Sequence, residues 1–243
     1  YRMLGVLVFF LAVWSVTPLG LPDYLKSCSR NDPNLNECAL KSAQDSIRQF
    51  SLGDSGRDLP SLDPLYIPEM KVYIPDEKGL KIVFKNNYFK GLSKLQLMGL
   101  KFDLDKKLIV ADALVNLDVK NEYEVSGKIL LLAIRSSGDA SIRLKNTLLH
   151  IQIWYEHVLQ DGKIHWNITK HDVKYEVEKA VFRLENLLND KNIGDQINKL
   201  INEMWRDIVA DVGPSICKSL TAAVVDNVAI LLKQVPYDEL MPE

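Results

Sequence analysis

A helical segment near the carboxyl end of the chain, from Ser215 to Gln234, is apolar around most of its circumference. Its apolar members are Ile216, Leu220, Val224, Val225, Val228, Ile230, Leu231 and Leu232. A helix without a clear polar face has to be surrounded by other parts of a fold. At 1.5 Å per residue it would run for about 30 Å. Because Lys218, Asp226 and Asn227 disfavour stable membrane insertion, the segment predicts a long helix enclosed by protein.

A second helix is expected directly before this segment. Apolar residues recur there at spacings of three and four, which gives one apolar face; they are Ile197, Leu200, Ile201, Met204, Trp205, Ile208 and Val209. The pair Gly213-Pro214 follows. Proline lacks a backbone N–H and is well suited to the first turn of a helix. The pattern therefore predicts a break at this pair, with Pro214 opening the enclosed helix.

The middle of the chain, from about Met70 to Leu184, alternates between apolar and polar residues instead. Such alternation is typical of antiparallel strands with one buried face, and it is clear in residues 81–84, 101–104, 108–110, 113–119 and 141–144. Hairpin turns are expected at Gly99, Gly127, Gly138 and Asp161-Gly162. Residues 129–133 are apolar on both faces and predict a central strand.

A strand-rich middle beside an enclosed helix indicates an α+β fold in which a curved antiparallel sheet wraps the helix. Apolar residues on both elements can leave an internal channel between them. They can equally pack into a solid core, and composition does not separate the two.

The beginning of the chain has the pattern of a signal peptide. Arg2 precedes an apolar run from Leu4 to Val16, and Pro18 follows soon after. This predicts a signal peptide over residues 1–20, cleaved near Gly20. A membrane anchor is the alternative, since the uncharged stretch continues to Pro22.

The remaining residues, 21–243, are expected to form one domain. Hydrophobic residues make up 47% and charged residues 26% of the sequence, which is typical of a globular protein. The net charge of −2 gives no strong cationic field, which argues against nucleic acid or an anionic membrane as the main partner. We expect a monomer.

The three cysteines suit an oxidising, extracellular compartment. Cys28 and Cys38 flank a turn-forming stretch, Asn31-Asp32-Pro33-Asn34, and we predict a disulfide between them. Cys217 then remains unpaired, either as a small buried hydrophobe or as a reactive thiol. After this loop, an amphipathic helix is indicated by Leu40, Ala43, Ile47 and Phe50.

Several local motifs resemble the takeout and haemolymph juvenile-hormone-binding family over nearly all of the mature chain. They are the Cys28…Asp32-Pro33…Cys38 loop, residues 60–65, Gly91-Leu92, Tyr123 with residues 127–131, Gly138-Asp139 with residues 144–146, residues 185–188 and residues 201–205. The resemblance implies a TULIP-like fold, in which a long C-terminal helix is wrapped by a highly curved antiparallel sheet that encloses an elongated hydrophobic tunnel. It also implies a possible link to biological rhythms.

Two departures from the family pattern matter. Ala133 and Ser136 stand where proline and glycine are expected, so the turn after residues 129–133 is expected to differ. Cys217 has no second late partner, whereas juvenile-hormone carriers use a second disulfide. The chain is therefore more similar to the takeout branch, and juvenile hormone itself is less favoured as the ligand.

The sequence contains no phosphate loop, Rossmann glycine pattern, Gly-x-Ser-x-Gly elbow or His-Glu-x-x-His helix. The histidines at 150, 157, 165 and 171 lack a third ligand at metal-binding spacing, and Asp103 and Asp105 are followed by two lysines at a hairpin end. We therefore predict no catalytic residues, no cofactor and no metal. Asn167-Ile168-Thr169 is a glycosylation sequon, and Asn167 is a candidate glycan site in a secreted chain.

Together these features predict a secreted, non-enzymatic carrier of a small elongated hydrophobic ligand of terpenoid type, such as juvenile hormone, or of fatty-acyl type. Alternatives are a secreted interaction or signalling protein with a solid core, and a secreted lipid esterase. The candidate tunnel residues, each of which has an ordinary core residue as its alternative, are Phe50, Leu117, Leu131, Ile151, Ile153, Tyr155, Trp166, Phe182, Trp205, Leu220, Val224, Val228 and Leu231. Tyr155, Trp166 and Trp205 also offer polar tips that could orient a ligand.

Overall fold

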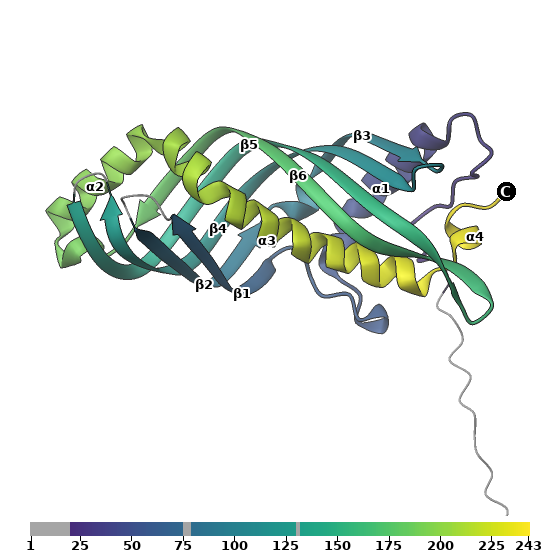
Figure 1. Ribbon diagram of the computed structural model, residues 1–243, viewed down its shortest axis with the longest axis horizontal. Coiled ribbons are helices and arrows are strands. Elements are labelled where there is room, and N and C mark those ends of the chain that lie inside the picture. The colour runs from purple at the N-terminus through teal and green to yellow at the C-terminus, as the bar shows by residue number, and fades with distance from the viewer. Residues whose placement is uncertain (1–19, 75–78, 130–131) are drawn as a thin grey trace, which may run out of the picture.

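The computed structural model describes residues 20–74, 79–129 and 132–243 of the chain (Figure 1). The predicted signal peptide, apart from its last residue, lies outside the described residues. The strands are β1 (Leu65–Ile74), β2 (Leu80–Lys90), β3 (Gln96–Asp103), β4 (Leu108–Ile129), β5 (Leu132–Gln160) and β6 (Lys163–Leu184). The helices are α1 (Leu35–Leu52), α2 (Lys191–Glu203), α3 (Trp205–Gln234) and α4 (Tyr237–Leu240), with short 3₁₀ turns η1 (Ser55–Arg57), η2 (Leu92–Lys94) and η3 (Leu187–Asn189).

All strand pairings are antiparallel, and the order in the sheet is β1-β2-β4-β5-β6, with β3 also paired to β4. Helix α3 packs against both β1 and β6, which are the two ends of this order. One helix can contact both ends only if the sheet curls around it. The predicted α+β fold, a curved antiparallel sheet around a long C-terminal helix, is confirmed.

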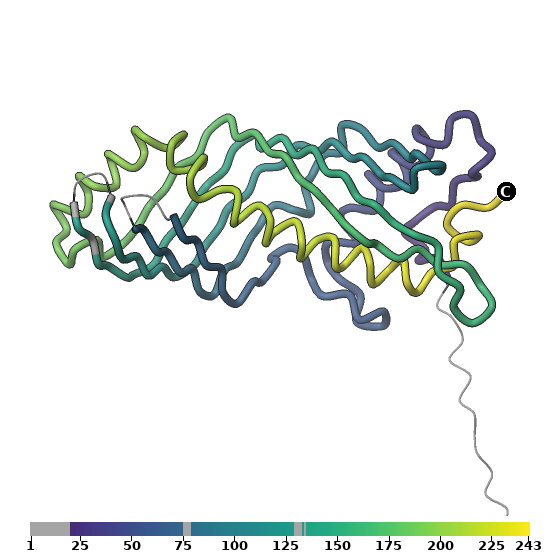
Figure 2. The backbone as a smooth tube through the Cα atoms, viewed as in Figure 1, coloured from purple at the N-terminus to yellow at the C-terminus, as the bar shows by residue number. Residues whose placement is uncertain are grey.

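Figure 2 shows how the elements are arranged along the molecule. Helix α3 runs along the long axis, α2 lies at one end, and α1 and α4 lie at the other. By length and composition α3 could cross a membrane, but the core helix of a soluble protein has the same properties. Here α3 is packed against the sheet.

The predicted break at Gly213-Pro214 is wrong. Helix α3 begins ten positions earlier than Ser215, at Trp205, and continues through Pro214. The interruption lies instead at Met204, whose φ of −97° and ψ of 22° separate α2 from α3. A proline inside a helix costs about 3 kcal/mol because it removes one backbone hydrogen bond and crowds the preceding turn. Packing of the apolar helix along the sheet offsets that cost.

Three of the predicted turns are also wrong. Gly99, Gly127 and Gly138 lie inside β3, β4 and β5, and only Asp161-Gly162 forms a hairpin turn. At Gly138 the reason is close packing, because a Cβ there would overlap the carbonyl oxygen of Glu185. The glycine marks a close approach between two parts of the chain, not a reversal of direction.

The predicted central strand over residues 129–133 is not one strand, although its described residues belong to β4 and β5, two interior strands of the sheet. Strand β4 finishes at Ile129, β5 begins at Leu132, and these two residues pair with each other. An apolar run of this length does not by itself distinguish the middle of a strand from its end.

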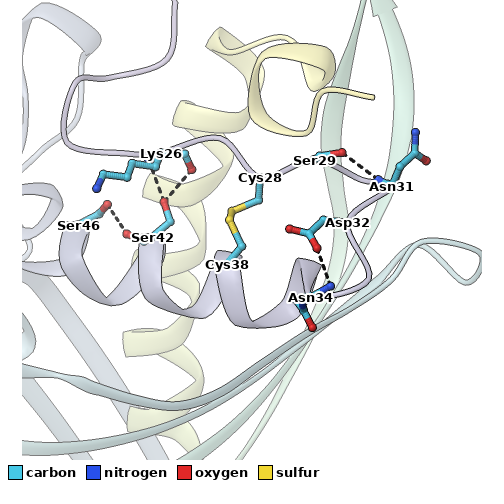
Figure 3. The surroundings of a disulfide bond; sticks show 9 residues. All are labelled: Lys26, Cys28, Ser29, Asn31, Asp32, Asn34, Cys38, Ser42 and Ser46. Carbon is cyan, nitrogen blue, oxygen red and sulfur yellow. Dashed lines mark hydrogen bonds between the residues drawn. A yellow bond between two sulfur atoms is a disulfide. The ribbon is translucent and has the colours of Figure 1, made fainter.

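The predicted disulfide between Cys28 and Cys38 is present, with a Cα–Cα distance of 5.9 Å (Figure 3). It fixes the extended N-terminal segment to α1. The Ser42 hydroxyl accepts a hydrogen bond from the Lys26 N–H at 2.9 Å and donates one to the Lys26 carbonyl at 2.7 Å. The disulfide and these bonds hold the segment against α1, the predicted amphipathic helix.

Replacing both cysteines, Cys28→Ser with Cys38→Ser, is expected to lower the free energy of unfolding by about 3 kcal/mol, because the bond no longer restricts a short loop in the unfolded chain. The urea midpoint measures this. Adding a reductant should lower the midpoint of the parent protein and leave that of the double variant unchanged. Equal midpoints for the parent and the double variant would contradict the expectation.

Candidate ligand-binding cavity

A cavity of about 210 Å³ lies between the inner face of the sheet and the two helices α2 and α3. Residues of β1, β2, β4, β5 and β6 line one side of it, and residues of α2 and α3 line the other. Its wall is almost entirely apolar. The site therefore favours apolar molecules, because moving their surface out of water into the cavity lowers the free energy.

Strand β4 shows how the sequence builds this wall. Five alternate residues are buried and line the cavity: Leu117, Val119, Asn121, Tyr123 and Val125. The residues between them are exposed and charged: Asp118, Lys120, Glu122 and Glu124. Successive side chains of a strand point to opposite faces and rise by about 3.3 Å per residue. The eight steps from Leu117 to Val125 therefore give the wall a length of about 26 Å, which makes the cavity elongated.

Helix α3 provides the opposite wall through residues spaced four apart. Ile208, Val212, Ile216 and Leu220 all line the cavity. Residues four apart lie on one face of a helix, so these four form one apolar row. The side chains of this row and those of the sheet do not fill the space between them, so the core here is not solid. The cavity is the internal channel that composition left open.

Two tyrosines and one cysteine in the wall carry groups that are hydrogen-bonded or buried. Tyr123 donates a hydrogen bond to the Glu185 carbonyl at 2.7 Å, and burial raises the pKa of its hydroxyl. Tyr175 donates to the Val209 carbonyl at 3.2 Å. Burial also raises the pKa of the free Cys217 thiol, against a smaller opposing effect of Thr221, so the thiol stays protonated at neutral pH. This favours the small buried hydrophobe over the reactive thiol.

The predicted tunnel residues fall into separate groups. Leu117, Phe182 and Leu220 line the cavity. Phe50 and Val224 pack against the core cluster around the cavity without lining it. The prediction for Leu131 lies outside the described residues.

Trp205, Leu231 and Ile151 lie away from the cavity wall. The Trp205 ring is buried beneath two cations, with Lys179 at 5.6 Å and Arg206 at 4.5 Å from its centroid. Leu231 packs in a small cluster with Leu59 and Val235, and Ile151 is half-buried on β5.

The last group forms a second cluster with the disulfide and α4. Its predicted members are Ile153, Tyr155, Trp166 and Val228. The rings of Tyr155 and Trp166 stack at 4.3 Å, and Trp166 meets the α4 ring of Tyr237 at 5.6 Å. Burial raises the pKa of Tyr155 to about 12. Two of the three aromatic residues proposed to orient a ligand therefore pack together in a cluster apart from the cavity.

Sequence reasoning did not select much of the cavity wall. The residues passed over include Met70, Phe84, Phe89, Val119, Tyr123, Ile197 and Ile201. The alternation that selected Leu117 continues without a break to Val125 and would have identified the β4 row. Nothing local to β1, β2 or α2 indicates which of their buried residues face a cavity.

The polar residues considered for catalysis are dispersed. His150 contacts Asp112 at 2.7 Å on the exposed side of the sheet, and Asp103 pairs with Lys106 at 2.9 Å, which lowers the pKa of that carboxyl. Within residues 20–74, 79–129 and 132–243, no group of three or more His, Cys, Asp or Glu side chains could hold a metal ion. Asn167 is half-buried and donates to Glu156 at 2.9 Å.

Comparison with known proteins agrees with this geometry. The family model described as haemolymph juvenile hormone binding protein matches residues 5–242. The circadian clock-controlled protein daywake of Drosophila melanogaster is 31% identical over 237 residues, covering 90% of this chain and 88% of the relative, and daywake of Drosophila yakuba is 28% identical over 231 residues with the same coverage.

Among solved structures, the crystal structure of Takeout 1 from Epiphyas postvittana matches with a TM-score of 0.83 and 26% sequence identity. The match covers 90% of this chain and 100% of that one. A family model over nearly the whole chain and a shared fold lead to one conclusion: the chain belongs to the haemolymph juvenile hormone binding protein family, which includes the takeout proteins.

Proposed function

We propose that this protein is a secreted carrier that binds one small, elongated hydrophobic ligand, of terpenoid or fatty-acyl type, in the cavity between the sheet and helices α2 and α3. The observation that carries the proposal is the cavity itself. Its walls are the β4 row from Leu117 to Val125 and the α3 row from Ile208 to Leu220. An elongated apolar space inside a family that generally binds hydrophobic ligands supports a carrier over a protein with a solid core.

The apolar wall can supply the affinity that a carrier needs. Burying about 400 Å² of apolar ligand surface contributes at most about 10 kcal/mol at 25 cal/mol/Å². Association costs remove a large part of this. Dissociation constants in the micromolar to nanomolar range follow without a strong ionic contact.

Terpenoid and fatty-acyl ligands both suit this apolar wall, and juvenile hormone is not favoured over other ligands of these classes. Cys217 has a free thiol, so the second disulfide expected of juvenile-hormone carriers does not form within this chain. The name of the daywake relatives supports a role under clock control. We therefore propose that the carrier, too, is under the control of the circadian clock.

Secretion is supported by the apolar run of residues 4–16 and by the Cys28–Cys38 disulfide, since such bonds persist in oxidising compartments. The mature protein in this proposal is a monomer of one domain, residues 21–243, with Asn167 as its glycan site. It carries its ligand without changing it.

Native mass spectrometry of the protein from insect-cell medium tests the carrier function. We expect one bound molecule per chain. We also expect farnesol or a long-chain fatty acid to displace a fluorescent apolar probe such as N-phenyl-1-naphthylamine. A single ligand-free mass, together with no displacement up to the solubility limit of each compound, would sink the carrier function.

A further inference from the structure

One polar pair lies at the apolar wall of the cavity: Asn121 on β4, which lines the cavity, and Asn87 on β2, which is hydrogen-bonded to it. Asn87 is fully buried, and Asn121 is 7% exposed. The Asn87 amide nitrogen donates to the Ile67 carbonyl at 2.9 Å and to the Phe84 carbonyl at 3.1 Å. Because both carbonyls only accept, the Asn87 nitrogen must face them and its oxygen must face Asn121.

This constraint determines the orientation of the second amide. Asn121 has to present its nitrogen to the Asn87 oxygen, and the two atoms are 3.0 Å apart. The Asn121 Oδ1 atom is therefore left at the free end of the pair. It is buried without a hydrogen-bond partner among the described residues, and Asn121 lines the cavity.

A buried polar atom without a partner is unfavourable, and native structures contain few of them. An amide oxygen accepts hydrogen bonds and cannot donate them. Since Asn121 lines the cavity, a donor brought into the cavity beside it can satisfy Asn121 Oδ1. The atom thus distinguishes ligands that carry an O–H or N–H from ligands that offer acceptors alone.

Thr147 provides an internal comparison. It is 4% exposed, it lines the same cavity, and its hydroxyl oxygen is also without a partner among the described residues. Its β4 partner is Val115, six residues from Asn121, or about 20 Å along the strand. A hydroxyl can donate as well as accept, so Thr147 does not select for donors.

We propose that Asn121 Oδ1 accepts a hydrogen bond from the polar end of the ligand. The ligand class is then an elongated apolar molecule with a terminal donor, such as a long-chain or terpenoid alcohol, a primary amide or a protonated acid. Esters, ethers and hydrocarbons of equal length bind more weakly. This inference rests on the carrier function proposed above and specifies the chemistry of its ligand.

The test compares dodecan-1-ol with 1-methoxyundecane, which have the same number of non-hydrogen atoms, as competitors of a fluorescent apolar probe on the unmodified protein. The alcohol should bind about tenfold more tightly, the ratio expected for one hydrogen bond worth about 1.4 kcal/mol. Equal affinities overturn the donor preference and leave the carrier function standing. Binding of neither compound overturns both.

Two variants then locate the preference. Asn121→Leu keeps a similar side-chain size and should bind alcohol and ether equally, with the ether bound as tightly as before. Thr147→Val removes a polar atom from the same cavity and should keep the tenfold ratio. A ratio lost in Thr147→Val but kept in Asn121→Leu overturns the assignment to Asn121. If Asn121→Leu does not fold, the ratio of the parent protein still decides whether there is a donor preference, and a ratio lost in Thr147→Val still overturns the assignment to Asn121.

Discussion

Replacing Ile216 with tryptophan is expected to weaken ligand binding by about 50- to 100-fold. Ile216 lies within the α3 row, between Val212 and Leu220, and faces the β4 wall across the cavity. An indole there would occupy space that the ligand needs. If it removes about 100 Å² of ligand contact, the loss is about 2.5 kcal/mol, which corresponds to roughly 70-fold in the dissociation constant.

Lys218→Trp is the matched control. Lys218 lies two residues further along α3 with its side chain exposed, and the same substitution there should leave the affinity unchanged. Both affinities are measured by displacement of the apolar probe, and both variants should retain the far-UV circular dichroism of the parent. Unchanged affinity in a folded Ile216→Trp variant would mean that the ligand does not occupy this cavity.

Replacing Gly91 with alanine is expected to lower the free energy of unfolding by about 3–4 kcal/mol. Gly91 follows β2 with φ of 117°, a conformation that residues with a Cβ rarely adopt. A Cβ would also overlap the carbonyl oxygen of Asn116, beside the irregularity in β4 between Val115 and Leu117. The clash involves backbone on both sides, so no side-chain rotation relieves it.

Gly162→Ala separates the two contributions. Gly162 has φ of 78° in the β5–β6 turn, and a Cβ there would meet nothing within 4 Å. This variant should therefore lose only about 1 kcal/mol from the conformational preference. Urea denaturation of both variants measures the difference. Equal losses would show that the close approach to Asn116 costs nothing.

The enclosed helix could be predicted because a helix that is apolar on nearly all sides has to be surrounded, and the strand-rich middle could be predicted because alternation marks one buried face of each strand. The break at Gly213-Pro214 could not, since local preference at Pro214 opposes the packing of the whole of α3 and packing prevails. The hairpin turns predicted at the glycines inside β3, β4 and β5 were wrong for a related reason. A close approach such as that at Gly138 arises from a segment distant in sequence, here Glu185.

The candidate site was predicted only in part. Periodicity selects the buried face of an element but does not say which partner covers that face. Leu117 and Tyr155 both belong to buried faces, yet the first lines a cavity and the second stacks on the Trp166 ring. Choosing aromatic residues for their polar tips favoured the packed cluster. The polar residues of the wall whose side-chain oxygens lack a partner among the described residues are Asn121 and Thr147, which are residue types seldom sought in an apolar wall.

The cavity wall draws on residues from Met70 to Leu220, which come from β1, β2, β4, β5, β6, α2 and α3. No single strand or helix holds the site, so a ligand binds the folded state and has little affinity for the unfolded one. By thermodynamic linkage, a ligand at 100 times its dissociation constant stabilises the fold by about 2.7 kcal/mol. Loaded protein should therefore resist proteolysis longer than empty protein, and the supply of ligand would set the lifetime of its carrier.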